Sequence, residues 1–279
     1  MRRTVVLAAT ILAATCGSAW AQSRQAPARR VSPPPVAGSD RFSILVDGGA
    51  QLAVGSFGQS FTLTKNVESA PVTTDLKVGT SGFFDAGVRM RFARRLSVGV
   101  VGFASSGTAA GTVDAKVPHP FYFNQSRDVS GSLSGLSRKE AGVHVELAYR
   151  ATVARRGEVT LFGGPSYISA EQDLVADVTY SDTYPYDTAT FTAAPTTTAR
   201  GSAAGFNLGG EAMWLLNRRV GISGLVRYTR ATIELSAGSG NTVSATAGGI
   251  QAGAGLRLFF GRSVTSTKRP VPPKAPKKK

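Results

Sequence analysis

The chain has 279 residues, of which 42% are hydrophobic and only 18% are charged. This composition excludes a highly charged disordered chain and a coiled coil. The single cysteine, Cys16, excludes a disulfide scaffold and a cysteine-based zinc cluster. The two histidines, His119 and His144, are too few for a multi-histidine metal site. We therefore expect neither a metal nor a cofactor.

The formal net charge of +15 is concentrated at the two ends of the chain. Residues 41–261 contain 20 basic and 16 acidic residues, so the body of the protein carries only about +4. A nucleic-acid-binding fold needs its positive charge on one face of the folded body. We therefore expect no nucleic-acid partner.

Residues 1–21 have the pattern of a cleaved Sec-type signal peptide. Two arginines precede an apolar run over 5–15, and small residues at the −3 and −1 positions fit cleavage before Gln22. The apolar run is too short to span about 30 Å of hydrocarbon. The sequence thus predicts export from the cytoplasm.

Proline and basic residues dominate both segments that flank the body. Residues 22–40 contain four prolines and predict an extended, solvated periplasmic linker. Residues 262–279 form a basic, proline-rich tail, which also favours an extended conformation. Two readings of this periplasmic tail stay open: it binds an anionic cell-wall polymer through its lysines, or it is merely solvated.

From residue 41 onward, apolar residues recur at every second position, which indicates strands with chemically different faces. In residues 84–92, for example, apolar side chains alternate with glycine and charged residues. Eight such strands are predicted, over residues 42–54, 84–92, 96–106, 141–149, 158–170, 206–214, 220–228 and 250–260. Within one of them, Pro165 lacks the N–H that a central strand needs, so we expect a bulge there.

The connections between these strands alternate in length. Short, arginine-rich turns are predicted at 93–95, 152–157 and 217–219, and long polar loops at 57–79, 107–137, 171–200 and 236–245. Such long loops are unusual in a compact soluble domain, and their segregation to one rim is typical of an outer-membrane barrel. The predicted fold is all-β: an eight-stranded antiparallel up-and-down transmembrane β-barrel over 41–261, with short periplasmic turns and long outer loops.

Bulky aromatic residues end the apolar face of four strands beside the short turns: Phe92, Tyr149, Trp214 and Phe260. A girdle at the lipid–water boundary explains this placement. The alternative is a soluble periplasmic lipocalin-like barrel that binds a ligand and turns its apolar face inward.

The polar face carries charges of both signs, namely Asp47, Asp85, Arg89, Arg91, Glu140, His144, Glu146, Glu211, Arg227 and Arg257. Eight strands enclose a lumen only wide enough to be filled by side chains. Unpaired charges would be costly there, so we expect arginine–carboxylate pairs that plug the lumen, with Asp85, Arg89, Glu146, Glu211, Arg227 and Arg257 at their centre. The alternative is a narrow channel or carrier for small or hydrophobic solutes, opened when these pairs exchange partners.

The segments Leu161–Tyr167 and Leu256–Phe260, together with the eight alternating strands, give the chain a family resemblance. It resembles the small eight-stranded outer-membrane β-barrels, the class of the OmpA transmembrane domain, OmpX, OmpW and opacity proteins, within the porin family of small barrels. The resemblance implies a Gram-negative cell envelope, insertion by the barrel assembly machinery, contact with outer-membrane lipid and lipopolysaccharide, and a monomer.

We expect a structural or surface-interaction role rather than an enzymatic one. Neither His119 nor His144 lies on a lipid-facing strand with a nearby serine, as a lipid deacylase would need. In the long segment 171–200, Tyr180, Tyr184 and Tyr186 are candidates for contact with a host or envelope partner, since tyrosine is enriched at binding surfaces.

Overall fold

The computed structural model describes residues 41–52, 55–236 and 242–261, all within one unit of the chain. The predicted signal peptide, the periplasmic linker and the basic tail lie outside the described residues. The described part contains twelve β-strands. Within it there is no helix long and apolar enough to cross a membrane.

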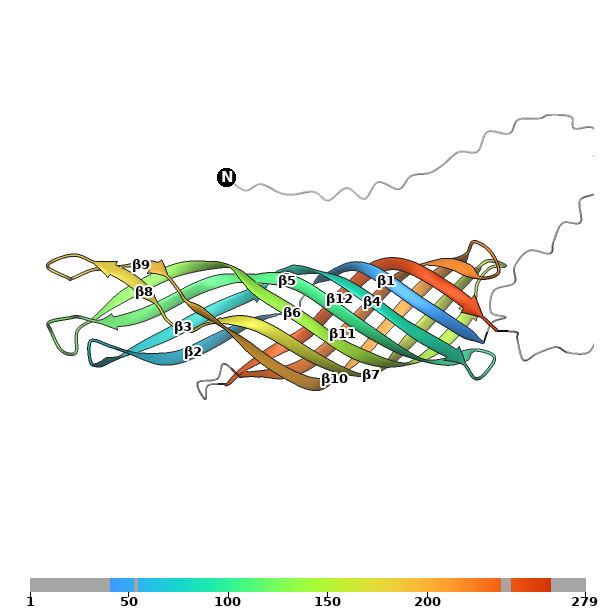
Figure 1. Ribbon diagram of the computed structural model, residues 1–279, viewed down its shortest axis with the longest axis horizontal. Helices are drawn as coiled ribbons and strands as arrows, with labels where there is room; N and C mark the ends of the chain where they lie inside the picture. The colour runs from blue at the N-terminus through green and yellow to red at the C-terminus, as the bar shows by residue number, and fades with distance from the viewer. Residues whose placement is uncertain (1–40, 53–54, 237–241, 262–279) are drawn as a thin grey trace, which may run out of the picture. The chain divides into compact units, whose positions relative to one another are not determined.

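Eight strands form a closed antiparallel ring, which confirms the predicted barrel (Figure 1). Their order around the ring is β1 (Phe42–Leu52), β4 (Thr80–Arg91), β5 (Leu96–Pro118), β6 (Ser126–Thr152), β7 (Gly157–Val175), β10 (Thr196–Leu215), β11 (Val220–Ser236) and β12 (Thr242–Phe260). The ring closes where β1 pairs with β12, from Phe42 opposite Phe260 to Leu52 opposite Ile250. Closure leaves this eight-stranded ring without a free first or last strand, which a sheet in lipid requires.

The tight turns lie at one end of the barrel, as predicted. They connect β4 to β5, β6 to β7 and β10 to β11, and both Phe42 and Phe260 lie at this same end. In the last of these turns the Asn217 side chain accepts hydrogen bonds from the backbone N–H groups of Arg219 and Val220. We call this the tight-turn end and the opposite one the long-loop end.

The long-loop end contains much more strand than predicted. Residues 107–118 and 126–137 continue β5 and β6 into one long hairpin, so the expectation of a loop there is wrong. The segment 57–79 is likewise mostly a hairpin of β2 (Ser56–Lys65) and β3 (Glu68–Val78), with β3 paired to β5. The segment 171–200 contains the end of β7, the start of β10 and a small hairpin of β8 (Thr179–Asp182) and β9 (Ala189–Ala193).

We call the part of the structure that these additional strand residues form at the long-loop end the extension. Apolar side chains fill its interior. The inward positions of β5 and β6 stay apolar beyond the predicted strand ends, which is why pairing continues. Five of the six largest fully buried apolar side chains of the described residues line this part: Leu76, Ile168, Leu174, Ile233 and Leu235. The interior is therefore apolar toward the long-loop end, whereas the predicted charges occupy the half near the tight turns.

Outward-facing apolar residues form a belt around the half of the barrel near the tight turns. Val88, Leu208 and Ile222 are 59%, 63% and 45% exposed, so the alternative of a soluble barrel with this face turned inward is wrong. The aromatic residues predicted at the tight-turn end all face outward, namely Phe92, Tyr149, Trp214 and Phe260. A second girdle of aromatic residues, which was not predicted from the sequence, borders the belt toward the long-loop end: Phe84, Tyr167, Phe206 and Tyr228.

The two aromatic girdles are separated by the length of one membrane crossing. The span from Phe84 on β4 to Phe92, just after this strand, covers nine residues with both ends counted, and the span from Phe206 to Trp214 on β10 also covers nine. A transmembrane β-strand needs about 9–11 residues. The belt therefore has the height of the hydrocarbon region of a membrane.

Pro165 lies in β7 without the predicted bulge. The register of β7 with β10 passes through Pro165, opposite Phe206, unchanged. On the other side, the pairing of β7 with β6 is interrupted between His144 and Leu147, which is where the missing N–H falls. An interruption of the ladder, rather than an extra residue, accommodates the proline.

Candidate functional site

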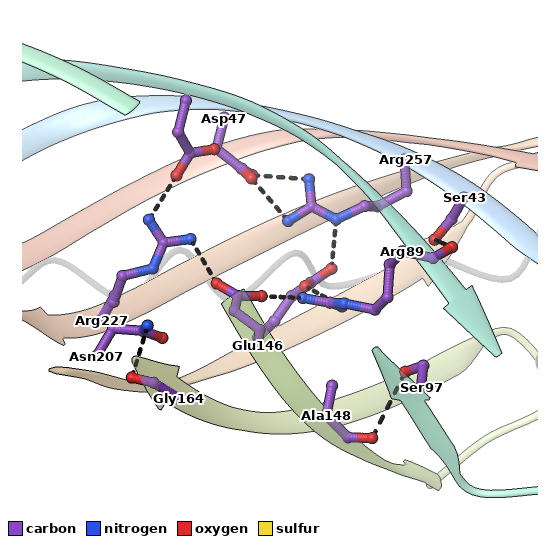
Figure 2. A network of polar contacts seen from close by, with 12 residues as sticks. Ser43, Asp47, Arg89, Ser97, Glu146, Ala148, Gly164, Asn207, Arg227 and Arg257 are labelled. Atoms are coloured by element: carbon purple, nitrogen blue, oxygen red, sulfur yellow. Dashed lines mark hydrogen bonds and ion pairs between the residues drawn. The ribbon is translucent and has the colours of Figure 1, made fainter. Parts of the chain in front are cut away.

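Two guanidinium groups share one carboxylate in the middle of the lumen (Figure 2). Arg89 on β4 lies 3.0 Å from one oxygen of Glu146 on β6, and Arg227 on β11 lies 3.2 Å from the other. Arg227 also pairs with Asp85 at 2.8 Å. All four side chains are at least 95% buried, so these ion pairs are shielded from solvent.

A third guanidinium extends the network toward the line at which the barrel closes. Arg257 on β12 lies 2.6 Å from Glu211 on β10 and 2.8 Å from Asp47 on β1. Glu211 in turn lies 3.2 Å from Arg89, which joins this group to the first. The structure thus brings together in one network all six residues that we placed at the centre of the lumen.

Neutral amides continue the network toward the long-loop end. Arg227 donates to the Gln251 side-chain oxygen, and the Gln251 amide donates to Gln51. The Gln51 amide donates in turn to Glu140, which also pairs with Arg138 at 2.6 Å. Neither glutamine was predicted as a lumen residue, because neither is charged, although both lie on the inward faces of β1 and β12.

An aromatic ring packs against the centre of the network. The guanidinium carbons of Arg89 and Arg227 lie 5.6 Å and 5.5 Å from the centre of the Phe162 ring. At this distance the face of the ring attracts each cation. Nearer the tight turns, Arg150 and Glu158 form another buried pair at 3.0 Å. Charged and aromatic side chains together therefore fill this half of the lumen.

A serine and a histidine contact each other in the lumen, on the long-loop side of the Glu146 carboxylate. His144 Nδ1 lies 2.8 Å from the Ser166 hydroxyl, which also accepts a hydrogen bond from Asn207. The sequence analysis missed this pair because it joins neighbouring strands. A serine beside a histidine is a nucleophile–base arrangement, yet His144 is fully buried and stacks on Phe103 at 4.5 Å. Within the described residues, no cluster of metal-ligating side chains is present.

Five exposed apolar side chains and the half-buried Tyr186 lie at the far tips of three hairpins, and we call this group the crown: Val67, Phe121, Tyr122, Phe123, Tyr184 and Tyr186. Val67 is 90% exposed, Phe123 77% and Tyr184 82%. The Phe121 and Tyr186 rings are 5.4 Å apart, in edge contact. Three aromatic residues of the crown lie in the β5–β6 turn, which the sequence analysis treated only as part of a long loop.

Polar contacts hold the three tips against one another. Arg127 on β6 pairs with Asp182 on β8 at 2.7 Å and donates to the Tyr186 carbonyl. Asn66 in the β2–β3 turn donates to the Pro118 carbonyl, and the Asn124 N–H donates to Glu68. The three hairpins are therefore connected side by side.

The predicted contact tyrosines have different surroundings. Tyr184 is exposed and Tyr186 half-buried, and their rings meet at 6.1 Å. Tyr180 instead packs on the apolar interior, beneath the Arg127 guanidinium at 5.6 Å. His119 is also buried and accepts hydrogen bonds from the N–H groups of Phe121 and Tyr122, so it shapes the turn.

No family model matches the sequence, and no curated protein matches it. Solved structures with a similar fold are outer-membrane β-barrels. Neisserial surface protein A is 15% identical, with a TM-score of 0.40 over 78% of this chain and 97% of that one. Outer membrane protein OprG of Pseudomonas aeruginosa is 12% identical, with a TM-score of 0.45 over 81% and 100%. Outer membrane protease OmpT of Escherichia coli is 10% identical, with a TM-score of 0.41 over 80% and 97%. These likenesses concern the β-barrel fold alone.

Proposed function

We propose that the protein is a non-enzymatic barrel of the bacterial outer membrane that binds a surface partner through the crown. The crown itself carries this proposal. Aromatic side chains exposed together at the tips of three connected hairpins form an apolar patch, and such patches mark interaction sites. Because Arg127 and its partners hold the hairpins in place, little conformational entropy is lost when a partner binds.

The orientation follows from the positions of the chain ends. Both Phe42 and Phe260 lie at the tight-turn end. With a signal peptide and a periplasmic linker before β1, this end faces the periplasm and the crown faces outward. The basic tail then also lies in the periplasm, where the anionic cell-wall polymer is its proposed partner. Co-sedimentation with cell wall, compared with a chain ending at Gly261, tests this assignment.

The lumen network acts as a plug in this proposal. Arg89, Arg227 and Arg257 each pair with two carboxylates, so the guanidinium groups span the lumen from wall to wall. Arginine is suited to this role because its planar group makes several directed hydrogen bonds. The membrane half of the barrel is thereby stabilised from inside by this network together with two small apolar clusters, around Phe162 and around Met213.

The crown is tested on whole cells. Triple substitution Phe121→Ser, Phe123→Ser and Tyr184→Ser should abolish barrel-dependent cell–cell aggregation and adherence to host cells. The control replaces Thr73, Asp114 and Ser130 with alanine on the outward side of the same hairpins. Both variants must show the heat-dependent mobility of a folded barrel. Unchanged adherence of the crown variant would overturn the proposed function.

A second candidate is a carrier for small hydrophobic solutes. The specific observation in its favour is the apolar interior at the long-loop end, combined with a stretch of the barrel wall beside it, between β2 and β12, where the strands are not paired. Among the described pairings, β2 pairs only with β3, and β12 pairs with β1 only as far as Ile250. Uptake of a small hydrocarbon by cells that express the barrel, measured against cells that lack it, separates this candidate from the first.

A further inference from the structure

A groove runs along the outward face of β4, β5, β6 and β7 at the border of the apolar belt. It consists of two adjoining hollows of about 590 and 570 Å³, which share Phe84, Ala104, Ala141 and Ser169. Each hollow has a volume within the range of small-molecule sites, about 300–1,000 Å³. The groove lies outside the lumen and shares no residue with the crown.

Small residues form the floor of the groove, and aromatic residues form its sides. Apart from Val143, the outward positions along its floor are small, namely Gly82, Ala86, Gly102, Ala104, Ala141 and Ser169. Phe84 and Tyr167, which are 57% and 59% exposed, project beside them. Most other outward positions of the belt carry larger side chains, such as Val88, Val145 and Leu208. The groove is therefore a channel in the lipid-facing surface that an acyl chain would fill.

A cation lies at the upper end of the groove, which is the end nearer the long loops. Lys139 on β6 lines the upper hollow, is exposed, and takes part in none of the ion pairs of the described residues. Glu171, the other exposed charge there, is already paired with Arg200 at 3.1 Å. The Ser106 residue lies opposite Lys139 in the strand register and also lines the hollow. The upper end thus offers a positive charge and a hydroxyl to an anionic group.

We propose that this groove binds one phosphorylated acyl glycolipid of the outer leaflet, the lipopolysaccharide anchor. An acyl chain lies on the small-residue floor between Phe84 and Tyr167, and a sugar-linked phosphate meets Lys139. An ammonium–phosphate contact is charge-assisted and therefore stronger than a neutral hydrogen bond. The choice of leaflet rests on the orientation proposed above, because the groove borders the belt on the side of the long-loop end.

Native mass spectrometry of the full chain, processed in the host and extracted in mild detergent, tests the site. The probe is purified diphosphorylated lipid A, with phosphatidylglycerol as the competing lipid. Lys139→Gln should weaken lipid A binding about tenfold, the loss expected for one hydrogen bond to a charged group. Ala104→Leu should abolish the one-to-one complex, because its side chain fills the floor.

Matched controls replace similar residues elsewhere on the outward surface. Lys116→Gln changes another exposed lysine, which lies on β5 outside the groove. Ala254→Leu changes another small residue of the belt, which lies on β12. Neither should alter binding. Equal binding by the two lysine variants, or equal affinity for phosphatidylglycerol, would overturn the proposal. The mobility of each variant in unheated gels reports the barrel separately, and the adherence assay reports the crown, so neither result depends on lipid binding.

Discussion

Asp47 on the first strand and Arg257 on the last strand form a buried ion pair across the line at which the barrel closes, with 2.8 Å between their charged groups. Gly255 lies opposite Asp47 in the register, and a side chain there would collide with the Asp47 carboxylate. The glycine therefore provides the space that the pair occupies. Residues more than two hundred positions apart thus connect the two ends of the folded chain.

Removal of Arg257 should strongly destabilise the barrel. Arg257→Ala leaves Asp47 and Glu211 buried without this partner, and breaking a buried pair costs about 3–5 kcal/mol. We expect the free energy of unfolding, measured by urea titration in lipid vesicles, to fall by about that amount. Arg200→Ala, which removes an exposed pair on the outer surface, should change it by less than about 1 kcal/mol. Equal effects of the two substitutions would show that the network does not stabilise the barrel.

Replacement of Glu146 should make the lumen conduct. Glu146→Ala deprives both Arg89 and Arg227 of a partner, so two cations remain close together and attract water and anions. In planar bilayers we expect no discrete current steps for the natural chain and anion-selective steps for the variant. Glu234→Ala, on the outward face of β11, is the matched control and should stay silent. Current steps in the natural chain would favour the channel over the plug.

The barrel and its lumen residues could be predicted because both depend on the period-two pattern alone. Which charges pair could not be predicted, because partners such as Asp47 and Arg257 are set by strand register and tilt. The extension at the long-loop end was missed for another reason. Its outward positions are rich in serine, threonine and aspartate, which are typical of loops, while glycines interrupt the inward face, so that apolar residues such as Val113 and Val129 form too sparse a pattern.

A charge in the middle of the apolar belt should oppose membrane insertion. Val88 faces outward, midway between the two aromatic girdles, and is 59% exposed. Val88→Lys should lower the free energy of unfolding in lipid vesicles by about 2–4 kcal/mol, the depth-dependent cost of lysine near the bilayer midplane. Thr73→Lys, on the outward face of β3 in the extension, should change it by less than about 1 kcal/mol. If both lysines were tolerated equally, the belt would not face lipid.

Loss of Arg127 should release the small β8–β9 hairpin from the rest of the crown. Its guanidinium holds Asp182 at 2.7 Å and donates to the carbonyls of Tyr186 and Pro118. Hydrogen bonds to a charged group contribute about 1.5–3 kcal/mol each, so Arg127→Ala should increase local opening about tenfold or more. Limited digestion of intact cells with chymotrypsin, which cuts after aromatic residues that no proline follows, should then cleave after Tyr186 about tenfold faster. Lys116→Ala, which removes an exposed cation from β5, should leave the rate unchanged. Equal cleavage of the natural chain and Arg127→Ala would mean that the hairpin is held by its apolar contacts, with Tyr180 rather than Arg127 as its anchor.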